Sequence, residues 1–116
     1  MPMTLNPIEY FRVRVKFLTA AEGGRGGPVD GKFGLYRPNI TLNGETFHGA
    51  VFLASPKEIA LGRQTDVEIA FSCCQSTHGF NPGDVFYLHD GPRRVAEGTV
   101  LEKGVKQYVR PDEASD

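Results

Sequence analysis

The feature that most constrains this chain is an Asn-Gly pair, Asn43-Gly44, with alternating apolar and polar residues on both sides of it. Asn and Gly readily adopt the positive φ angles that both central residues of a type I′ turn require, so the pair predicts a two-residue β-hairpin. A period of two with one apolar face is typical of a half-buried antiparallel sheet. The residues expected on that apolar face are Ile40, Leu42, Phe47, Val51 and Leu53.

Similar alternation recurs along the chain and is strongest over residues 10–18. Further strands are expected over residues 65–73, 85–89 and 94–101, the last two joined around Asp90-Gly91-Pro92. With the two arms of the central hairpin this makes six strands, and turn signals recur about every eight to twelve residues. We therefore expect an all-β fold, a six-stranded antiparallel closed β-barrel, because closure removes the exposed edges of a sheet.

The expected organisation is a lead-in over residues 1–9, one barrel domain over residues 10–102 and a charged C-terminal tail over residues 103–116. A chain of 116 residues can bury a single core without disulfides or metals. Its net charge of −1 produces no global attraction to nucleic acid or to an anionic membrane. The sequence contains no apolar run of about 18 residues and no secretory signal pattern, so no membrane association is expected.

Several kinds of chemistry are not favoured by the residues. The glycine-rich stretch 22–28 lacks a following Lys-Ser/Thr and a helix, so a nucleotide site is not expected. Cys73, Cys74 and His78 lack a fourth ligand for zinc, and neighbouring cysteines on a strand point to opposite faces. Adjacent cysteines cannot join distant segments, which indicates a reducing compartment and a cytoplasmic protein. We expect no cofactor, no metal and no catalytic activity.

Three cations, Arg12, Arg14 and Lys16, alternate with the apolar residues of the strand over residues 10–18. One interpretation is a solvated outer face whose long side chains cover apolar surface. The other is a row of phosphate-binding groups spaced about 6.7 Å apart. Arg93 and Arg94, at the tip of the second hairpin, leave the same two alternatives.

A resemblance to a known family is carried by several short motifs. In order, they are Phe17-Leu18-Thr19, Glu22-Gly23-Gly24-Arg25, Pro28, Tyr36-Arg37-Pro38 and the hairpin over residues 90–100. This set resembles the opening motifs and the closing hairpin of the C-terminal barrel of elongation factor Tu. The resemblance covers roughly residues 12 to 102, and it implies a six-stranded antiparallel barrel.

In that family the barrel contacts the T-stem of tRNA, the nucleotide-exchange factor and the GTPase domain. The T-stem contacts come from a Gln, a Thr and a Glu, and the matching positions here carry Asn39, His48 and Asp90. The GTPase domain lies outside the resemblance, so GTP hydrolysis is not implied.

The leading hypothesis from the sequence is a non-catalytic binding module that mediates protein–protein interaction. The alternative is binding of structured RNA such as a tRNA stem, and the least favoured is a small enzyme of unknown reaction. The protein partner and the oligomeric state are left open. The candidate binding residues are Arg12, Arg14, Lys16, Arg25, Arg37, Asn39, His48, His89, Asp90, Gly91, Arg93 and Arg94.

Overall fold

The computed structural model describes residues 6–24, 26–31, 36, 38–71 and 80–108, with the backbone alone at 6–7 and 107–108. Within these residues the only helical element is a short 3-10 turn, η1, so the all-β class is confirmed. The elements are β1 (Asn6–Phe17), η1 (Ala20–Glu22), β2 (Val29–Asp30), β3 (Asn39–Leu42), β4 (Glu45–Phe47), β5 (Ala50–Ala54), β6 (Glu58–Ile59), β7 (Gln64–Phe71), β8 (Val85–Asp90) and β9 (Arg93–Tyr108).

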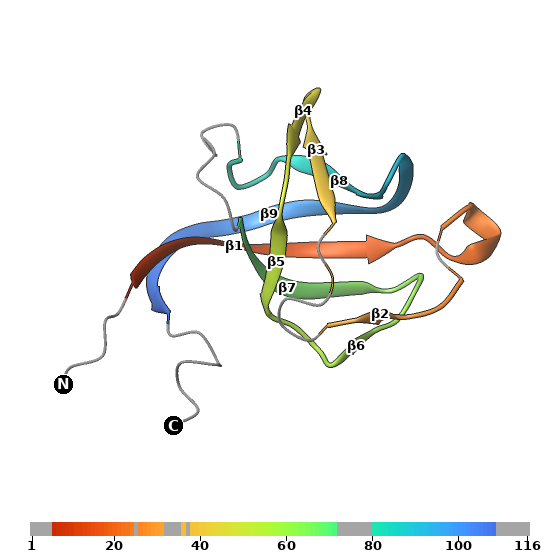
Figure 1. Ribbon diagram of the computed structural model, residues 1–116, viewed down its shortest axis with the longest axis horizontal. Coiled ribbons are helices and arrows are strands. Elements are labelled where there is room, and N and C mark those ends of the chain that lie inside the picture. Colours follow the sequence, from red (N-terminus) through yellow and green to blue (C-terminus); the bar gives the residue numbers. More distant parts are fainter. Residues whose placement is uncertain (1–5, 25, 32–35, 37, 72–79, 109–116) are drawn as a thin grey trace.

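Seven of the strands form one antiparallel sheet in the order β4-β3-β8-β9-β1-β7-β5, and β2 and β6 form a separate two-stranded sheet. The large sheet curls into a half-barrel (Figure 1). The expected closed barrel of six strands is therefore wrong. In the described chain, β4 and β5 are the two edges of the sheet and are not paired with each other.

The open sheet follows from a bend at Gly49, whose φ angle is 72°. The residues before this glycine pair with β3, where Phe47 lies opposite Ile40, whereas the residues after it pair with β7, where Phe52 lies opposite Ile69. One predicted strand is therefore divided between the two edges of the sheet. The two edges are joined by the chain itself rather than by a ladder of hydrogen bonds.

The same bend shifts the side-chain alternation by one residue. Phe47 faces the core as expected, and Ala50 and Phe52 join it in the core cluster. Val51 is also buried, at 6% exposure, but lies outside that cluster. Phe52 is 2% exposed, whereas Leu53 is only half-buried. The expected apolar face is thus correct before Gly49 and wrong after it.

Both predicted tight turns are present. Asn43 and Gly44 have φ angles of 50° and 82° and connect β3 to β4, so the predicted Asn-Gly hairpin is confirmed. Gly91, with a φ angle of 59°, lies in the turn between β8 and β9. The strongest local signals of the sequence therefore locate both hairpins of the sheet.

The paired strands extend beyond the expected limits of the barrel at residues 10 and 102. β1 begins at Asn6 and β9 continues to Tyr108, and these two residues lie opposite each other. Part of the expected lead-in and part of the expected tail therefore form a ribbon that projects from the sheet (Figure 1). The backbone pairing continues there although the apolar alternation that marks the strand over residues 10–18 does not.

The largest side chains buried in the core are phenylalanines. Phe80 is completely buried, and its ring centroid lies 4.8 Å from that of Phe11 and 5.2 Å from that of Phe86. Phe80 lies between the strands predicted over residues 65–73 and 85–89, so the strand alternation did not indicate this core residue. Gly98 lies opposite Phe86, and a Cβ atom at Gly98 would be 2.4 Å from the Phe86 ring, so only glycine leaves room for it.

Candidate functional site

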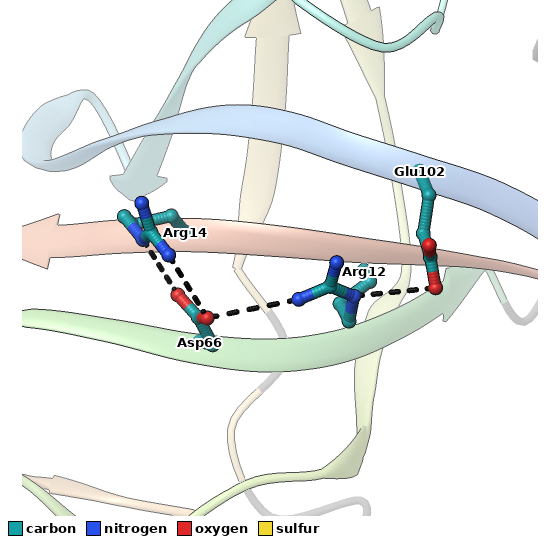
Figure 2. Close-up of polar contacts among 4 residues, drawn as sticks. All are labelled: Arg12, Arg14, Asp66 and Glu102. Atoms are coloured by element: carbon teal, nitrogen blue, oxygen red, sulfur yellow. Dashed lines mark hydrogen bonds and ion pairs between the residues drawn. The ribbon is translucent and has the colours of Figure 1, made fainter.

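The outer face of β1, β7 and β9 carries a network of ion pairs (Figure 2). The Arg14 guanidinium donates to both carboxylate oxygens of Asp66, from Nε at 2.8 Å and from Nη2 at 3.2 Å. Arg12 lies between two carboxylates, with Nη1 3.7 Å from Asp66 Oδ2 and Nε 3.2 Å from Glu102 Oε1. The strand register produces these contacts, since Asp66 lies opposite Arg14 and Glu102 lies opposite Arg12.

The hydrogen bond from Arg14 and the charges of Arg14 and Arg12 lower the pKa of Asp66, although partial burial opposes the effect. The pKa of Arg14 is raised by the same hydrogen bond. Lys16, the third predicted cation, lies opposite Glu97 on β9. Each of the two arginines thus contacts at least one carboxylate, and the lysine lies opposite another.

We call the outward surface of β1, β7 and β9 the charged face, and its charged residues are equal numbers of cations and carboxylates. It consists of Arg12, Arg14, Lys16, Asp66, Glu68, Glu97, Glu102 and Lys106. Lys106 contacts the carboxylate of Glu68. Because the positive groups are matched by neighbouring negative ones, this face has no net charge to attract a row of phosphates. The solvated-face interpretation of the basic strand fits this arrangement.

A second surface lies on the outer side of β3 and β8. Asn39 lies opposite His89 across these strands, and Thr41 lies opposite Tyr87. Thr41 Oγ1 and His89 Nε2 are 2.8 Å apart and share a hydrogen bond. His48, which follows β4, shares a hydrogen bond of 3.2 Å with Asn39 through Nδ1 and Oδ1.

Arg94 adds a cation to this surface from β9. Its guanidinium carbon is 3.7 Å from the centre of the Tyr87 ring, which is the geometry of a cation–π contact. We call this surface the β3–β8 face. It consists of Asn39, Thr41, His48, Tyr87, His89 and Arg94.

Asp90, the third position implied by the family resemblance, has a different partner from the other two. Its Oδ1 accepts a hydrogen bond of 2.9 Å from the Tyr36 hydroxyl. The Tyr36 ring in turn packs against Phe17 and Phe52, with centroid distances of 5.9 and 5.7 Å. The structure therefore brings Asn39 and His48 into direct contact and ties Asp90 to a tyrosine that packs on the core.

Of the remaining candidates, Arg93 at the hairpin tip makes a structural contact, and two others lie outside the described residues. Arg93 lies opposite Asp90, and its Nη1 is 3.5 Å from the carbonyl oxygen of Gly24, to which it donates. Arg25 and Arg37 lie outside the described residues, as do Cys73, Cys74 and His78. The hypotheses attached to those five residues stay predictions.

The glycine-rich stretch follows η1, whose N-terminus carries a capping box between Thr19 and Glu22. Thr19 N donates to Glu22 Oε1 at 2.9 Å, and Glu22 N donates to Thr19 Oγ1 at 3.3 Å. The bond from the Thr19 backbone is the main cause of a lowered pKa for Glu22. No strand is predicted between residues 19 and 35, but the described residues there form η1 and β2.

Two members of the β3–β8 face, Thr41 and Tyr87, were not among the candidates from the sequence. A signal for both was present, because a period of two puts Thr41 on the face of Asn39 and Tyr87 on the face of His89. The pairing of β3 with β8 was needed to bring the two sets together. Sequence alternation alone does not predict which strands are neighbours.

A scan against protein-family models finds none that matches this sequence. The resemblance to the elongation factor barrel therefore depends on the motifs alone. In the described part of the chain, no group of three or more His, Cys, Asp or Glu side chains could hold a metal ion. None of the helices described there is long and apolar enough to cross a membrane.

Proposed function

We propose that this chain is a non-catalytic binding module that contacts a partner protein through the β3–β8 face. The observation that carries the proposal is the gathering of Tyr87, Arg94, His48 and His89 on one outward surface. Tyr and Arg are enriched at protein interfaces, whereas Lys, Glu and Asp are depleted there. The β3–β8 face has the first kind of composition and the charged face has the second.

The geometry of the β3–β8 face favours binding in a second way. Tyr87 is held by strand pairing on both sides and by the guanidinium of Arg94, and Thr41 and His89 hold each other by a hydrogen bond. Side chains that are already restrained lose less conformational entropy when a partner binds. This face is therefore prepared for contact, and it offers both an aromatic surface and hydrogen-bonding groups.

The alternative function, binding of a tRNA stem, is supported by the hydrogen bond between Asn39 and His48, two positions that the family resemblance implies. The distribution of charge on the two faces favours a protein partner over RNA. Affinity for RNA depends on several cations that neutralise phosphates. The β3–β8 face supplies one arginine, Arg94, and the cations of the charged face are matched by carboxylates.

The family resemblance itself is part of the proposal. Two contacts connect its opening motifs to its closing hairpin, namely Arg93 with Gly24 and Asp90 with Tyr36. Motif residues that hold one another at a distance in sequence support a shared fold more than isolated matches do. We infer a cytoplasmic protein whose half-barrel is built like the C-terminal domain of elongation factor Tu.

The test is affinity capture from a lysate of the native cells, with and without nuclease, using the wild-type chain and two double variants. Tyr87→Ala with Arg94→Ala removes the centre of the β3–β8 face. Arg14→Ala with Asp66→Ala is the matched control, because it removes one ion pair from the charged face, between β1 and β7 and away from β8.

We expect the wild type and the control to retain the same partner protein after nuclease treatment, and the Tyr87/Arg94 variant to retain at least about tenfold less of it. Retention of no specific protein, or equal retention by both double variants, would reject the proposal. Loss of all capture after nuclease would favour the RNA alternative, which predicts a mobility shift with tRNA that weakens steeply as salt increases.

A further inference from the structure

The ribbon formed by the ends of β1 and β9 differs from the rest of the sheet because it has only two strands. In the described chain, β7 pairs with β1 between Phe11 and Lys16, and β8 pairs with β9 between Arg93 and Thr99. Backbone hydrogen bonds from the segment before β8 follow β9 as far as Val100. Residues 6–10 and 104–108 pair with each other beyond those limits. We call this segment the arm; it projects from the half-barrel in Figure 1.

The two faces of the arm are unequal. On one face, Tyr10 lies opposite Gly104, and the Lys106 ammonium is 4.9 Å from the centre of the Tyr10 ring. On the other face, Val105 lies opposite Glu9 and is 68% exposed. Val105 is thus an exposed large apolar side chain on a strand that no further described strand covers.

An isolated two-stranded ribbon is marginally stable in water, and its unpaired edge groups are a template for another strand. We propose that the outer edge of β9 in the arm pairs antiparallel with the same edge of a second copy of this chain. The two-fold axis passes by Val105, so that each Val105 lies opposite its counterpart. The two arms then form one four-stranded sheet across the dimer.

The sequence of the arm fits this register. With Val105 on the axis, Gly104 lies opposite Lys106 of the second copy, and Lys103 lies opposite Gln107. No two like charges are directly opposed, and the exposed valine meets another apolar side chain, which stabilises a cross-strand pair. A two-fold contact of this kind stops at a dimer, because both copies use the same β9 edge and no such edge is left for a third copy.

The other edge of the arm is less suited to pairing. It belongs to β1 and contains Pro7, which has no backbone N–H to donate to a neighbouring strand. Proline on an edge strand is one of the devices that prevent further pairing. The β9 edge is therefore the one that we assign to the dimer.

The contact is small, since it involves one short strand from each copy. Stable protein interfaces bury about 1,200 to 2,000 Å² in total, and smaller ones are weak or transient. We expect a dissociation constant above about 1 μM, so the dimer should form reversibly as the protein is concentrated.

Sedimentation equilibrium of the full chain over a range of concentrations tests the proposal. The wild type should rise from the monomer mass of 12.7 kDa toward twice that value. Val105→Lys would place two ammonium groups opposite each other and should weaken dimerisation at least about tenfold. Val85→Lys is the matched control, because Val85 is the other exposed large apolar residue described, 49% exposed, and lies outside the arm.

A wild type that stays monomeric throughout, or a Val105→Lys variant that dimerises like the wild type, would overturn the proposal. Equal weakening by Val85→Lys would overturn it too, because the arm would then not be the site. Val105→Cys gives an independent check. Opposed residues in antiparallel strands have Cα atoms about 4.5 to 5.5 Å apart, which suits a disulfide.

Mild oxidation should therefore link Val105→Cys into covalent dimers more completely than Val85→Cys or the wild type, whose own cysteines serve as the background. The three proteins should be compared by non-reducing electrophoresis. Equal linking in all three would contradict the assigned register.

Discussion

The two halves of the long β1–β9 pair have the same backbone pairing and very different surroundings. In the half-barrel, β1 is flanked by β7 and its inward residues Phe11, Val13, Val15 and Phe17 are almost completely buried. In the arm, the same two strands continue without a further described neighbour, and Val105 is largely exposed. The pairing of two strands is thus not what buries a side chain; the curl of the whole sheet does that.

This difference separates what each half contributes. The half-barrel supplies stability through its aromatic core, while the arm adds hydrogen-bonded length that contributes little burial. We therefore expect substitutions in the half-barrel to change the free energy of unfolding, and substitutions in the arm to change association. The following predictions test that separation.

The largest effect is expected from Phe11→Ala on β1. The Phe11 ring is completely buried and makes edge contacts with Phe80 at 4.8 Å and Phe71 at 6.0 Å between centroids. Removing a buried phenyl ring costs about 3 to 5 kcal/mol through lost burial and the cavity left behind. Urea unfolding followed by circular dichroism measures this value, and a loss below about 1 kcal/mol would contradict the assignment of Phe11 to the core.

A comparison of two glycines on β9 should give the next largest effect. In the half-barrel, a Cβ atom at Gly98 would lie 2.4 Å from the Phe86 ring, whereas in the arm a Cβ at Gly104 would lie 3.0 Å from the Tyr10 ring. Gly98→Ala should cost about 1 to 3 kcal/mol, since the Phe86 ring is packed in the core. Gly104→Ala should cost less, because the half-buried Tyr10 ring can move, and equal losses in urea unfolding would contradict the comparison.

Asp66→Asn should have a smaller effect, because the ion pair with Arg14 is partly exposed, at 42% and 48% of the two side chains. Exposed ion pairs contribute about 0.2 to 1 kcal/mol. Arg14 lowers the folded-state pKa of Asp66, so the pair stabilises the fold above the unfolded-state pKa of about 4. That contribution is lost as the pH falls through the lower folded-state value.

Unfolding of the wild type and of Asp66→Asn should therefore be compared from pH 7 down to the acid transition. The difference between the two proteins should be largest at neutral pH and should shrink below about pH 4. The pKa of Glu22 is also lowered, by its bonds to Thr19. Both proteins should therefore still lose some stability as the pH falls. A constant difference at every pH would contradict the ion pair.

The smallest effect is expected from Val105→Ala in the arm. Val105 is 68% exposed, and substitutions at such surface positions change the free energy of unfolding by less than about 0.5 kcal/mol. The measurement is urea unfolding at a protein concentration where the chain is monomeric. A loss above about 1 kcal/mol would mean that Val105 is packed and that the arm is not distinct from the half-barrel.

Much of the fold was predictable from local signals. The Asn43-Gly44 turn, the turn at Gly91 and the inward residues Val13, Ile69 and Phe86 all match the alternation and turn chemistry of the sequence. These features depend on residues within a few positions of one another. The bend at Gly49 was harder, because a glycine in a strand is compatible with a straight strand, a bulge or a corner.

The candidate site was only partly predictable. The outward position of Arg12 and Arg14 followed from a period of two, but their carboxylate partners Asp66 and Glu102 come from strands far away in the sequence. Tyr87 was overlooked for a similar reason, since its place beside Thr41 requires the pairing of β3 with β8.

The sequence by itself determined that this protein is all-β, where its two tight hairpins turn, and which face of its first long strand is apolar. Those properties depend on backbone torsion preferences and on side-chain period, which act over a few residues. Only the tertiary structure decided that the sheet stays open at β4 and β5, that Phe80 fills the core, and that the basic strand is matched by carboxylates. Strand order brings distant residues within reach, and electrostatic and packing energies depend on that distance rather than on sequence separation.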